Sequence, residues 1–485
     1  MARLVILGAG VAGHTAASFA RTWLGKEHDV VVVSPNTYYN WVPSNIWVGV
    51  GRMAPEKVVT ELRPIYDRSG VDFRQAKATA LHPEGSALEG RPYVEVEYTE
   101  PAKVGVKERI PYDFLINATG PKLNFGATEG LGPDKNSLSV CTAGHAKQAA
   151  DALAESIDRM RRGERQRFLI GTGHGMCTCQ GAAIEYLFNL EHVLCQEGVR
   201  DKAEMHWISN EYELGDFGMG GIHIRRGGYI SHSKSFTESM MAERGVHWHL
   251  RAHTKAVEPG LAHYETLEGT EHELPFDFAM LIPPFAGVGL QAFDHKGEEI
   301  TKGLFNPAGF MLVDGDYTPR PYEEWSPKDW PKTYQSPLYP NLYAAGIAFA
   351  PPHPISKPMK TPGGTLIVPT PPRTGMPSAM IGKAVTASIV DSINNGVTEA
   401  THSASMADMG AACVASAGCG WRCGSAVAMA VYPLIPDFER YPRFGRDTDL
   451  TFAEVGLAGH WLKYFLHLMF LYKVRQKLGW RLIPE

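Results

Sequence analysis

A glycine-rich turn near the start of the chain constrains the fold more than any other feature. The apolar run at residues 5–7 leads directly into Gly8, Gly10 and Gly13, and a helix-compatible stretch follows. A buried strand, a glycine turn and a helix amino terminus together bind a dinucleotide pyrophosphate, because backbone N–H groups and the helix dipole favour negative charge there. The first glycine permits the tight turn, the second lets the backbone approach the phosphates, and the third lets helix and strand pack closely. This context predicts a dinucleotide-binding domain.

The second predicted strand bears on how the dinucleotide is held. Residues 29–33 read Asp-Val-Val-Val-Val, a pattern typical of a strand buried on both faces. The strand ends at Ser34 and Asn36, where an acidic residue that binds the ribose is expected. The hydroxyl of Ser34 and the amide of Asn36 are therefore our candidates for the ribose contacts.

Length and composition restrict the class of protein. The chain has 485 residues, of which 44% are hydrophobic and 20% charged, so it can bury a large core in two or three domains. A net charge of -5 gives no sign of nucleic-acid binding, and seven cysteines in a chain this long do not indicate a disulfide scaffold. No signal peptide is recognised, since residue 3 already begins a predicted strand. We expect a cytoplasmic chain in which a cysteine pair that matters is catalytic.

A second strand, loop and helix unit begins at residue 167 and carries two cysteines in its turn. Cys177 and Cys179 lie where a two-dinucleotide flavoenzyme would bind its nicotinamide cofactor. A thiol at a helix amino terminus has a lowered pKa and is a better nucleophile near neutral pH. The alternative is that both are small buried residues that pack a turn. The helix-start position favours chemistry.

Two later segments resemble parts of FAD enzymes. Residues 112–121 form a predicted strand that ends at Thr119 and Gly120, the turn by which such enzymes leave the cofactor domain. Residues 341–347 form a late strand that brings Gly346 beside the flavin or its ribityl chain.

Several segments taken together resemble the sulfide:quinone oxidoreductase family, which is related to the flavoprotein subunit of flavocytochrome c sulfide dehydrogenase. That subunit is exported, and the missing signal peptide argues against it. The resemblance covers most of the chain in order. The segments that carry it are residues 34–45, 118–122, 141–146, the turn at Cys179 with Glu185 and Tyr186, 282–285 and 343–352.

The resemblance implies a two-electron reaction with sulfide and quinone as substrates and FAD as cofactor. Sulfide attacks a cysteine disulfide or persulfide on one side of the flavin, and the electrons leave to a quinone on the opposite face. Cys179 matches the flavin-proximal nucleophile, and Cys141 matches the cysteine near the flavin edge or sulfide entrance. Glu185 matches a carboxylate that moves protons, and His145 matches a polar neighbour of Cys141. For Glu185 and His145 a structural role is the alternative.

Two positions depart from the family. Ser405 stands at the place of the third cysteine, and serine cannot form a persulfide. Cys413 is the nearest replacement partner for Cys179, and Cys177 is the other candidate. Asp216 stands where the family has a histidine. The cysteine spacing over residues 413–423, which also includes Cys419 and Cys423, fits no common metal or cluster ligand set, so we expect no metal.

The segment before the last long predicted helix is rich in proline. Residues 351–372 contain eight prolines and cannot form a helix or a central strand, so we expect a stiff wall around the cofactor. Arg373 would stabilise the anionic reduced flavin, and surface exposure is its alternative. The remaining predicted cofactor contacts are Thr374, Gly375 and Ser44.

The carboxy-terminal segment predicts contact with a membrane. Residues 457–473 are apolar and aromatic but are interrupted by two histidines and a lysine, which argues against a spanning helix. With Lys473, Arg475, Lys477 and Arg481 beside it, the segment suits a helix that lies in the headgroup region; packing against the flavin domains is the alternative. The resemblance implies that Tyr464 and Phe465 lie near the quinone, with Phe444 or Tyr441 as an opposing ring.

We therefore predict an α/β fold with two Rossmann-like three-layer domains and a membrane-associating region. The expected boundaries are 1–145 and 290–400 for the FAD domain, 146–289 for the second domain and 401–485 for the carboxy-terminal region. The predicted function is oxidation of sulfide, or of a related small sulfur compound, with quinone as acceptor, by a peripheral protein on the cytoplasmic side that could form a homo-oligomer. The alternatives are an NADH:quinone flavoprotein and a flavin- or persulfide-carrying subunit of a larger complex.

Overall fold

The computed structural model of the protein describes residues 1–485 except for residues 88, 227, 373–374 and 419–423, and except for the side chains of residues 226, 413 and 414. The predicted cofactor residues Arg373 and Thr374, the cysteines Cys419 and Cys423, and the thiol of Cys413 therefore lie outside the described part.

The first sheet is assembled from both ends of the chain. Its strand order is β21-β8-β1-β2-β5-β6-β7, with β20 paired to β5 beside this path. The first five strands of that order run parallel, and β5, β6 and β7 are antiparallel. The strands are β1 (Arg3–Leu7), β2 (Asp29–Ser34), β5 (Asp72–His82), β6 (Tyr93–Tyr98), β7 (Lys107–Pro111), β8 (Phe114–Asn117), β20 (Gln291–Ala292) and β21 (Leu342–Ala344).

Two long helices pack together beside this sheet. They are α1 (Val11–Trp23) and α8 (Met376–Asn395), which come from opposite ends of the sequence. A Cβ atom on Gly382 would lie 2.5 Å from the carbonyl oxygen of Ala12, so the missing side chain lets the two backbones approach. The shorter elements of this part are β3 (Tyr38–Asn40), β4 (Val59–Glu61), α2 (Asn45–Gly49), α3 (Arg63–Ser69) and α7 (Thr301–Leu304).

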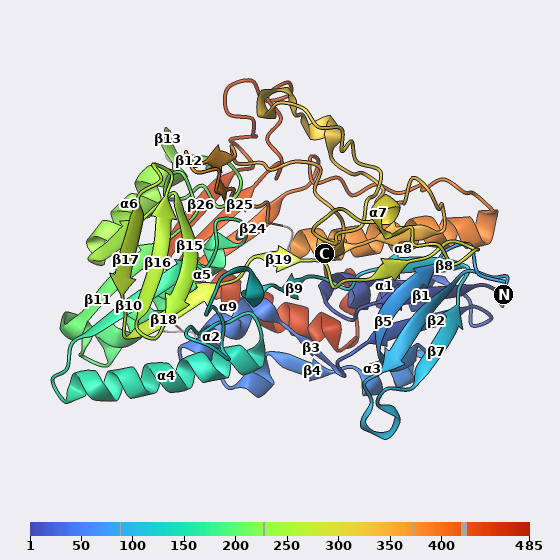
Figure 1. The fold of residues 1–485 in the computed structure, drawn as a ribbon, viewed down its shortest axis with the longest axis horizontal. Helices are drawn as coiled ribbons and strands as arrows, with labels where there is room; N and C mark the ends of the chain where they lie inside the picture. The colour runs from blue at the N-terminus through green and yellow to red at the C-terminus, as the bar shows by residue number, and fades with distance from the viewer. Residues whose placement is uncertain (88, 227, 373–374, 419–423) are drawn as a thin grey trace.

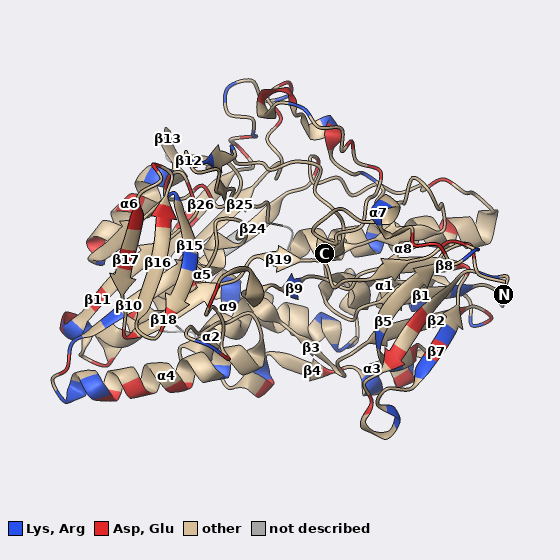
Figure 2. Cartoon of the chain, in the orientation of Figure 1, with Lys and Arg blue, Asp and Glu red and all other residues tan. Residues whose placement is uncertain are grey.

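The second sheet is wholly parallel, with the order β14-β11-β10-β18. An antiparallel sheet, β15-β16-β17, and the hairpin β12-β13 are attached to this part (Figure 1). Figure 2 shows that helix α4 carries charges of both signs along its length, as expected of a helix with one solvated face. The elements are β10 (Gln166–Thr172), β11 (Ala203–Ile208), β12 (His223–Arg226), β13 (Tyr229–His232), β14 (Val246–His249), β15 (Ala252–Glu258), β16 (Leu261–Thr266), β17 (Glu271–Pro275), β18 (Phe278–Ile282), α4 (Ala143–Arg161), α5 (Gln180–Gln196) and α6 (Ser233–Glu243).

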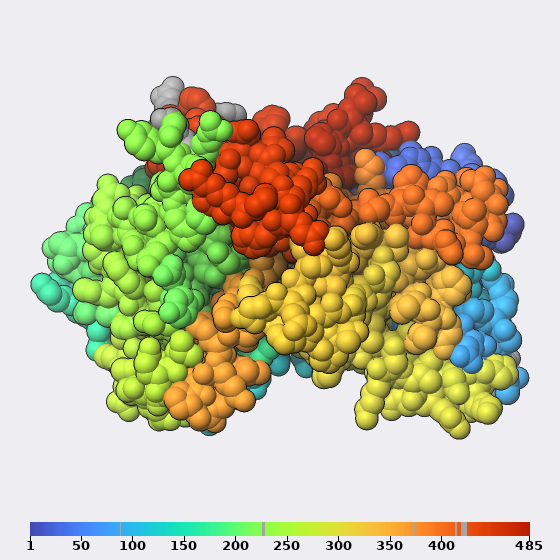
Figure 3. Space-filling view, turned by 90° about the horizontal axis from the view of Figure 1, so that it is seen from above, coloured from blue at the N-terminus to red at the C-terminus, as the bar shows by residue number. Residues whose placement is uncertain are grey.

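The carboxy-terminal part contains the antiparallel sheet β24-β25-β26 and helix α9. In the space-filling view of Figure 3 the orange to red residues of this part lie against both the green and the yellow parts of the chain. None of the described helices combines the length and apolarity needed to cross a bilayer. The elements are β24 (Ala411–Ala417), β25 (Ser425–Val431), β26 (Phe452–Gly456) and α9 (Leu457–Val474), and the two-stranded connections are β9 (Lys122–Leu123) with β19 (Phe285–Ala286) and β22 (Met359–Lys360) with β23 (Leu366–Ile367).

The predicted α/β class with two Rossmann-like folds is confirmed. The proline-rich segment forms only the two-residue strands β22 and β23, as expected. In each part a strand of the parallel sheet leads through a glycine turn into a helix, β1 into α1 and β10 into α5. The two turns therefore lie at the carboxyl ends of β1 and β10.

The close contact of α1 and α8 gives a stability prediction. Gly382→Ala adds helix propensity of about 1 kcal/mol, but its Cβ would meet the fixed backbone of Ala12, and overpacking costs about 1–3 kcal/mol. We expect the midpoint of thermal unfolding of the flavin-loaded protein to fall. Gly90→Ala is the control, because no described atom lies within 4 Å of its new Cβ. An unchanged or higher midpoint for Gly382→Ala would contradict the proposed packing.

Candidate functional site

The first glycine turn has one closed and one open side. A Cβ on Gly8, whose φ is +99°, would lie 2.2 Å from the Ala118 carbonyl oxygen, and a Cβ on Gly13 would lie 2.0 Å from the Gly8 carbonyl oxygen. By contrast, no described atom lies within 4 Å of the Cβ position of Gly10. Strand, turn and helix are thus pressed together while the backbone at Gly10 stays accessible. This arrangement fits the pyrophosphate of FAD.

The other predicted cofactor residues lie around this turn or near it. Thr119 donates from its hydroxyl to Asn117 Oδ1 at 2.8 Å, which orients the turn before Gly120. A Cβ on Gly346 would meet the Cβ of Ala12 at 2.9 Å, so the late strand reaches α1. Of the remaining residues, Ser34 is buried, Asn36 is exposed, and Gly375 precedes α8 as its N-cap residue.

Ser44 lies in a different environment from the one expected of a cofactor contact. Its hydroxyl lies 2.9 Å from Nδ1 of His467, a residue of α9. Ser44 is fully buried in this contact. The structure therefore connects Ser44 to the carboxy-terminal helix, and contact with FAD stays a prediction.

The second glycine turn is filled by protein atoms. A Cβ on Gly173 would lie 2.6 Å from Leu131 Cδ1, and a Cβ on Gly175 would lie 2.7 Å from both His253 Nδ1 and the Leu366 carbonyl oxygen. The backbone N–H of Gly175 donates to His253 Nδ1 at 3.1 Å. Unlike the turn at Gly10, this turn has no open approach at Gly173 or Gly175, so it is poorly suited to a second dinucleotide.

The cysteine-bearing loop is joined to the proline-rich segment by backbone hydrogen bonds. Val368 N–H donates to the Gly175 carbonyl at 2.8 Å, and Thr370 N–H donates to the Cys177 carbonyl at 3.0 Å. The Thr178 hydroxyl donates back to the Thr370 carbonyl at 3.0 Å. These bonds connect the cysteine loop to the segment that precedes α8, the helix that packs on α1.

Two buried amides hold the loop from the other side. Gln180 Nε2 donates to Asn210 Oδ1 at 2.9 Å and to the Cys177 carbonyl at 3.2 Å. Asn210 Nδ2 donates to the carbonyls of Gly175 and Cys177, each at 3.1 Å. The loop carbonyls are thus satisfied in the protein interior, which fixes the loop conformation.

Cys179 is the residue immediately before α5, as the sequence predicted. Its φ of +63° places it in the left-handed region, which is uncommon for a residue with a side chain. Backbone strain of this kind persists only where the surroundings enforce it, and it is concentrated at functional sites. The hydrogen bonds of the loop to Val368, Thr370, Gln180 and Asn210, here called the loop clamp, enforce this conformation.

Cys177 differs from the expectation that its thiol would be activated. The residue is fully buried, and its thiol donates to the Ile282 carbonyl at 3.1 Å. Burial raises the pKa of Cys177 well above its ordinary value, so the predicted lowering is wrong for this residue. The helix dipole does not compensate, because Cys177 lies before the cap position and inside the apolar interior.

Cys141 is brought from a distant part of the chain to the same region. Its backbone N–H donates to Ser139 Oγ at 3.2 Å, and Asn45 Nδ2 donates to the neighbouring Val140 carbonyl at 3.1 Å. Burial raises the pKa of Cys141 to about 11, against the lowering effect of the Ser139 hydrogen bond and with a smaller rise from Cys179. The thiols of Cys141, Cys177 and Cys179 are close enough to influence one another electrostatically.

Glu185 is a buried ion-pair residue. Both its carboxylate oxygens lie 2.5 Å from Lys463 Nζ, and the Ser416 N–H donates to Oε1 at 3.3 Å. Burial raises the pKa of Glu185, and the attraction of Lys463 opposes this rise. The contact to α9 was not expected, since the sequence reading placed this carboxylate with the sulfur chemistry.

His145 lies one turn into α4, in the segment that follows Cys141. Its ring packs on Phe125 with centroids 5.8 Å apart, and its Nδ1 is buried without a hydrogen-bond partner among the described residues. Burial lowers the pKa of His145, so a neutral ring is favoured. His145 lies four residues after Cys141 at the start of α4. Its role in the reaction stays a prediction.

The two residues that depart from the family pattern both make polar contacts, with Ser405 buried and Asp216 partly exposed. Ser405 accepts a hydrogen bond from the Ala407 N–H at 3.2 Å. Asp216 accepts hydrogen bonds from the Ser356 hydroxyl at 2.5 Å and the Gly218 N–H at 2.9 Å. A Cβ on Gly218 would lie 2.5 Å from the Thr370 carbonyl oxygen, so the Asp216 loop forms part of the wall around the cysteine loop.

Glu211 is bonded to the loop that contains Asp216. Its Oε1 accepts from the Phe217 N–H at 2.9 Å, and its Oε2 accepts from the Ser209 hydroxyl at 2.8 Å. The side chain is fully buried. Burial, with a further contribution from the charge of Asp216, raises the pKa of Glu211 to about 8.

The predicted quinone residues do not all come together. Tyr464 lies beside Trp47, with ring centroids 6.0 Å apart, while Phe465 points outward and is 55% exposed. Phe444 instead stacks on His223 of β12, with centroids 4.4 Å apart. The described contacts do not bring Phe444 to Tyr464 or Phe465, so an opposing ring at this position stays a prediction.

Helix α9 has an inverted distribution of polar and apolar residues. His460, Lys463 and His467 are buried on its inner face. These three residues follow the helical spacing i, i+3 and i+7, so they lie along one stripe of the helix. The outer face exposes apolar side chains, namely Trp461, Leu462, Phe465, Leu468 and Tyr472.

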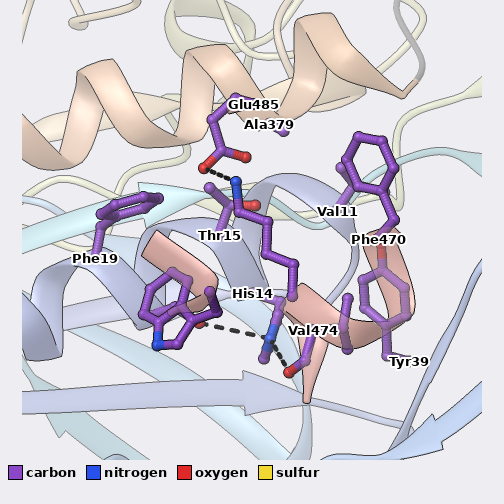
Figure 4. A pocket seen from close by; sticks show the side chains of 12 residues that line it. Val11, His14, Thr15, Phe19, Tyr39, Ala379, Phe470, Val474 and Glu485 are labelled. Atoms are coloured by element: carbon purple, nitrogen blue, oxygen red, sulfur yellow. Dashed lines mark hydrogen bonds and ion pairs between the residues drawn. The ribbon is translucent and has the colours of Figure 1, made fainter. Parts of the chain in front are cut away.

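A small cavity between α1, α8 and α9 is closed by residues after α9 (Figure 4). The Lys473 ammonium lies 2.6 Å from the Glu485 carboxylate and donates to the Ile483 carbonyl at 2.8 Å. His14 Nε2 lies 3.0 Å from the Val474 carbonyl oxygen. The sequence placed Lys473 among the cations that face lipid headgroups, and this is wrong because the residue is buried in these contacts.

Sequence reasoning missed most of the residues that shape the site. The loop clamp by Asn210 and the orienting contact of Asn45 have no local sequence signal, because each partner lies far away in the chain. The polar stripe of α9 did have a signal, since the spacing of its two histidines and one lysine is helical. The same three residues also interrupt the apolar run, and this interruption conceals the stripe in the sequence.

The chain is similar to several known proteins. A family model described as pyridine nucleotide-disulphide oxidoreductase matches residues 2–185. The chain is 29% identical over 472 residues to the sulfide-quinone reductase of Aquifex aeolicus, with 97% of this chain and 91% of the relative covered. It is 24% identical over 285 residues to the mitochondrial sulfide:quinone oxidoreductase of Dictyostelium discoideum, with 58% and 56% covered.

Solved structures give the same picture. The structure of the sulfide:quinone oxidoreductase from Aquifex aeolicus matches with a TM-score of 0.73 and 27% identity, covering 98% of this chain and 92% of the other. The structure of NDH2 from Plasmodium falciparum matches with a TM-score of 0.65 and 12% identity, covering 98% and 96%, and shares the fold.

The buried carboxyl of Glu211 gives a pH prediction. Because the folded protein holds this proton up to about pH 8 and the unfolded chain releases it near 4.5, stability falls as the pH rises between these values. Glu211→Gln removes the ionisable group and keeps the acceptor for Phe217. We expect the variant to lose less stability than the wild type between pH 5 and pH 8.5, by an amount on the order of a few kcal/mol. Denaturant unfolding at both pH values measures this, and equal losses would contradict it.

Proposed function

We infer that this chain is a member of the sulfide:quinone oxidoreductase family, that it oxidises sulfide and that it passes the electrons through FAD to a quinone. The observation that carries this conclusion is the contrast between the two glycine turns. The first turn is open at Gly10, whereas the second is filled and carries Cys179 beside the flavin part of the fold. A group of thiols therefore replaces the nicotinamide ring that a pyridine-nucleotide flavoenzyme would use at this position.

Cys179 is our proposed nucleophile for the sulfur reaction. It occupies the cap position of α5 in a conformation enforced by the loop clamp, and Cys141 is the nearby second thiol. Cys177 takes a supporting role, because its thiol is engaged by the Ile282 carbonyl. Cys413 remains a candidate partner for Cys179 in place of Ser405. When bound, FAD supplies a two-electron acceptor for the sulfur site and a donor for the quinone.

The residues that hold FAD in this proposal surround the first turn. Gly8, Gly10 and Gly13 accommodate the pyrophosphate, and Ser34 with Asn36 contact the ribose. Thr119, Gly120 and Gly346 border the flavin, together with the predicted contacts Arg373, Thr374, Gly375 and Ser44. The expected domain boundaries at residues 145, 289 and 400 belong to this proposal as well.

We place the quinone and the membrane at the outer face of α9. Exposed apolar patches on soluble proteins mark interaction sites, and a helix with an apolar outer face and basic residues beyond it suits the bilayer interface. Trp461 and Leu468 are 44% and 47% exposed, and Arg475 follows the helix. The protein would then be monotopic, on the cytoplasmic side, with Tyr464 and Phe465 at the quinone. A homo-oligomer remains compatible with this arrangement.

The proposed reaction is tested by an anaerobic titration of the flavin spectrum. We expect sulfide to bleach the flavin of the wild-type protein and NADH to leave it oxidised, because the second glycine turn is filled. Cys179→Ser should lose flavin reduction by sulfide and keep bound FAD. Cys177→Ser is the matched control two residues away and should retain reduction, since its thiol faces the Ile282 carbonyl.

Other outcomes of this titration separate the alternatives. Bleaching by NADH would favour an NADH:quinone flavoprotein. If sulfide reduces the flavin but added quinone and lipid give no turnover, the subunit of a larger assembly becomes the better description. Full turnover by Cys179→Ser would remove that residue from the chemistry.

The outer face of α9 gives a separate prediction about membrane binding. Phe465→Ser combined with Leu468→Ser removes two exposed apolar side chains, each contributing about 1.5–3 kcal/mol when buried. We expect the fraction of protein that sediments with liposomes to fall, while the flavin content stays unchanged. Val104→Ser is the control, because it changes an exposed apolar residue between β6 and β7. Unchanged sedimentation of the double variant would contradict the proposed docking face.

A further inference from the structure

A buried arginine of the carboxy-terminal part has no role in the reaction described so far. Arg446 lies between β25 and β26, and only 5% of the residue is exposed. Burial lowers the pKa of Arg446 to about 10, which still leaves the guanidinium charged at neutral pH. A buried charge is costly unless it is hydrogen-bonded. Packing alone therefore does not explain an arginine at this position, and its hydrogen bonds must.

The guanidinium of Arg446 joins two segments that are far apart in the sequence. Its Nε and Nη2 donate to the carbonyls of Pro433 and Leu434, at 3.2 Å and 3.1 Å. Its Nη1 donates to the Gly221 carbonyl at 2.7 Å, and Nη2 also donates to the Met219 carbonyl at 2.8 Å. A rigid fork of five donors can reach both segments at once, whereas an ammonium group cannot. The arginine thus connects the carboxy-terminal part to a loop of the second parallel-sheet part.

The loop that Arg446 holds has a backbone conformation that needs support from outside. Five residues of this loop, here called the 215–221 loop, have φ between +55° and +80°: Gly215, Phe217, Gly218, Gly220 and Gly221. Such a conformation costs glycine conformational entropy and strains a residue with a side chain. Besides Arg446, the support comes from Glu211, which accepts from the Phe217 N–H, and from Ser356 Oγ, which accepts from the Gly220 N–H at 3.1 Å.

The 215–221 loop packs against the residues that hold the cysteine loop. A Cβ atom on Gly218 would lie 2.5 Å from the Thr370 carbonyl oxygen and 3.6 Å from Gln180 Oε1. Thr370 and Gln180 both belong to the loop clamp, and Gln180 directly follows Cys179 at the start of α5. A displacement of the 215–221 loop would therefore remove the wall against which the loop clamp rests.

We propose that Arg446 is a positioning residue for the sulfur site. It fixes the 215–221 loop, this loop supports Thr370 and Gln180, and these two residues hold Cys179 in its left-handed conformation. The inference rests on the proposed function, because it concerns the geometry of the thiol that reacts with sulfide. The described hydrogen bonds of Arg446 all go to carbonyl groups, so the residue acts through the backbone and takes no part in bond-making. The carboxy-terminal part then contributes to the sulfur half of the reaction as well as to the quinone half.

The positive charge of Arg446 offers a different explanation, which the experiment must separate from positioning. A buried cation attracts the hydrosulfide anion whether or not it holds a loop in place. Arg446→Lys keeps the charge but removes the fork that reaches both segments, and Arg446→Met removes the charge and the fork together. Positioning predicts that both variants are impaired, whereas attraction by charge predicts that only Arg446→Met is impaired.

Anaerobic rapid mixing of the flavin-loaded protein with sulfide measures the limiting rate of flavin reduction per bound FAD and the sulfide concentration that gives half this rate. We expect Arg446→Lys and Arg446→Met to lower the limiting rate by about 100-fold, the loss that a misplacement of about 1 Å can cause. The half-saturating sulfide concentration should stay unchanged. Reoxidation of the dithionite-reduced protein by a short-chain ubiquinone should also stay unchanged, because it does not depend on the position of Cys179.

A second variant disturbs the same connection from its other end and leaves Arg446 intact. Gly218→Ala places a Cβ against the backbone of Thr370 and should lower the limiting rate of flavin reduction in the same way. Gly198→Ala is the matched control, because its φ of +68° equals that of Gly218 within a degree, and no described atom lies within 4 Å of its Cβ position. Arg200→Met is the control for the arginine, since Arg200 also donates to a backbone carbonyl, that of Ala203 at 2.8 Å. Both controls should be reduced at the wild-type rate.

The remaining outcomes decide against the proposal or against the proposed function. Wild-type reduction of Arg446→Lys would overturn the proposal, because charge alone would then suffice, and equal slowing of reduction and reoxidation would overturn it as general damage. If Arg446→Met does not retain FAD, Gly218→Ala decides the matter, and its reduction at the wild-type rate would overturn the proposal. Failure of the wild-type flavin to be reduced by sulfide would instead refute the proposed function, so the two failures are distinguishable.

Discussion

The arrangement of the whole site depends on a short backbone connection between two distant segments. The N–H groups of Val368 and Thr370 bond to the carbonyls of Gly175 and Cys177, and this contact joins the second parallel sheet to the segment that enters α8. Without it the cysteine loop would have no fixed position relative to the flavin part of the fold. Backbone hydrogen bonds suit this purpose because they depend little on side-chain identity, which leaves the loop side chains available for chemistry.

Two glycine turns of similar sequence have opposite consequences because their surroundings differ. At the first turn the backbone of Gly10 is open, and the neighbouring glycines allow β8 and α1 to close around it. At the second turn, Leu131 and His253 occupy the space that a cofactor would need. The same supersecondary unit therefore binds a dinucleotide in one place and positions a thiol in the other.

Helix α9 has two chemically different faces. Its apolar outer face suits a lipid surface, and its polar inner face is attached to the protein by three separate contacts, to Ser416, Glu185 and Ser44. Such a helix is held by specific polar bonds and leaves its apolar side chains free for the bilayer. The helix therefore meets the protein interior through polar contacts and the outside through apolar side chains.

The sequence by itself determined the features that arise from local pattern. The strand, glycine turn and helix at residues 3–23, the buried strand at residues 29–34 and the start of α5 at Cys179 follow from short-range periodicity and turn chemistry. Tertiary structure alone decided which thiol is engaged by Ile282, that Lys473 is buried and that Glu185 pairs with Lys463 across 278 residues. These facts depend on desolvation and on contacts between distant segments, and neither is encoded in the spacing of neighbouring residues.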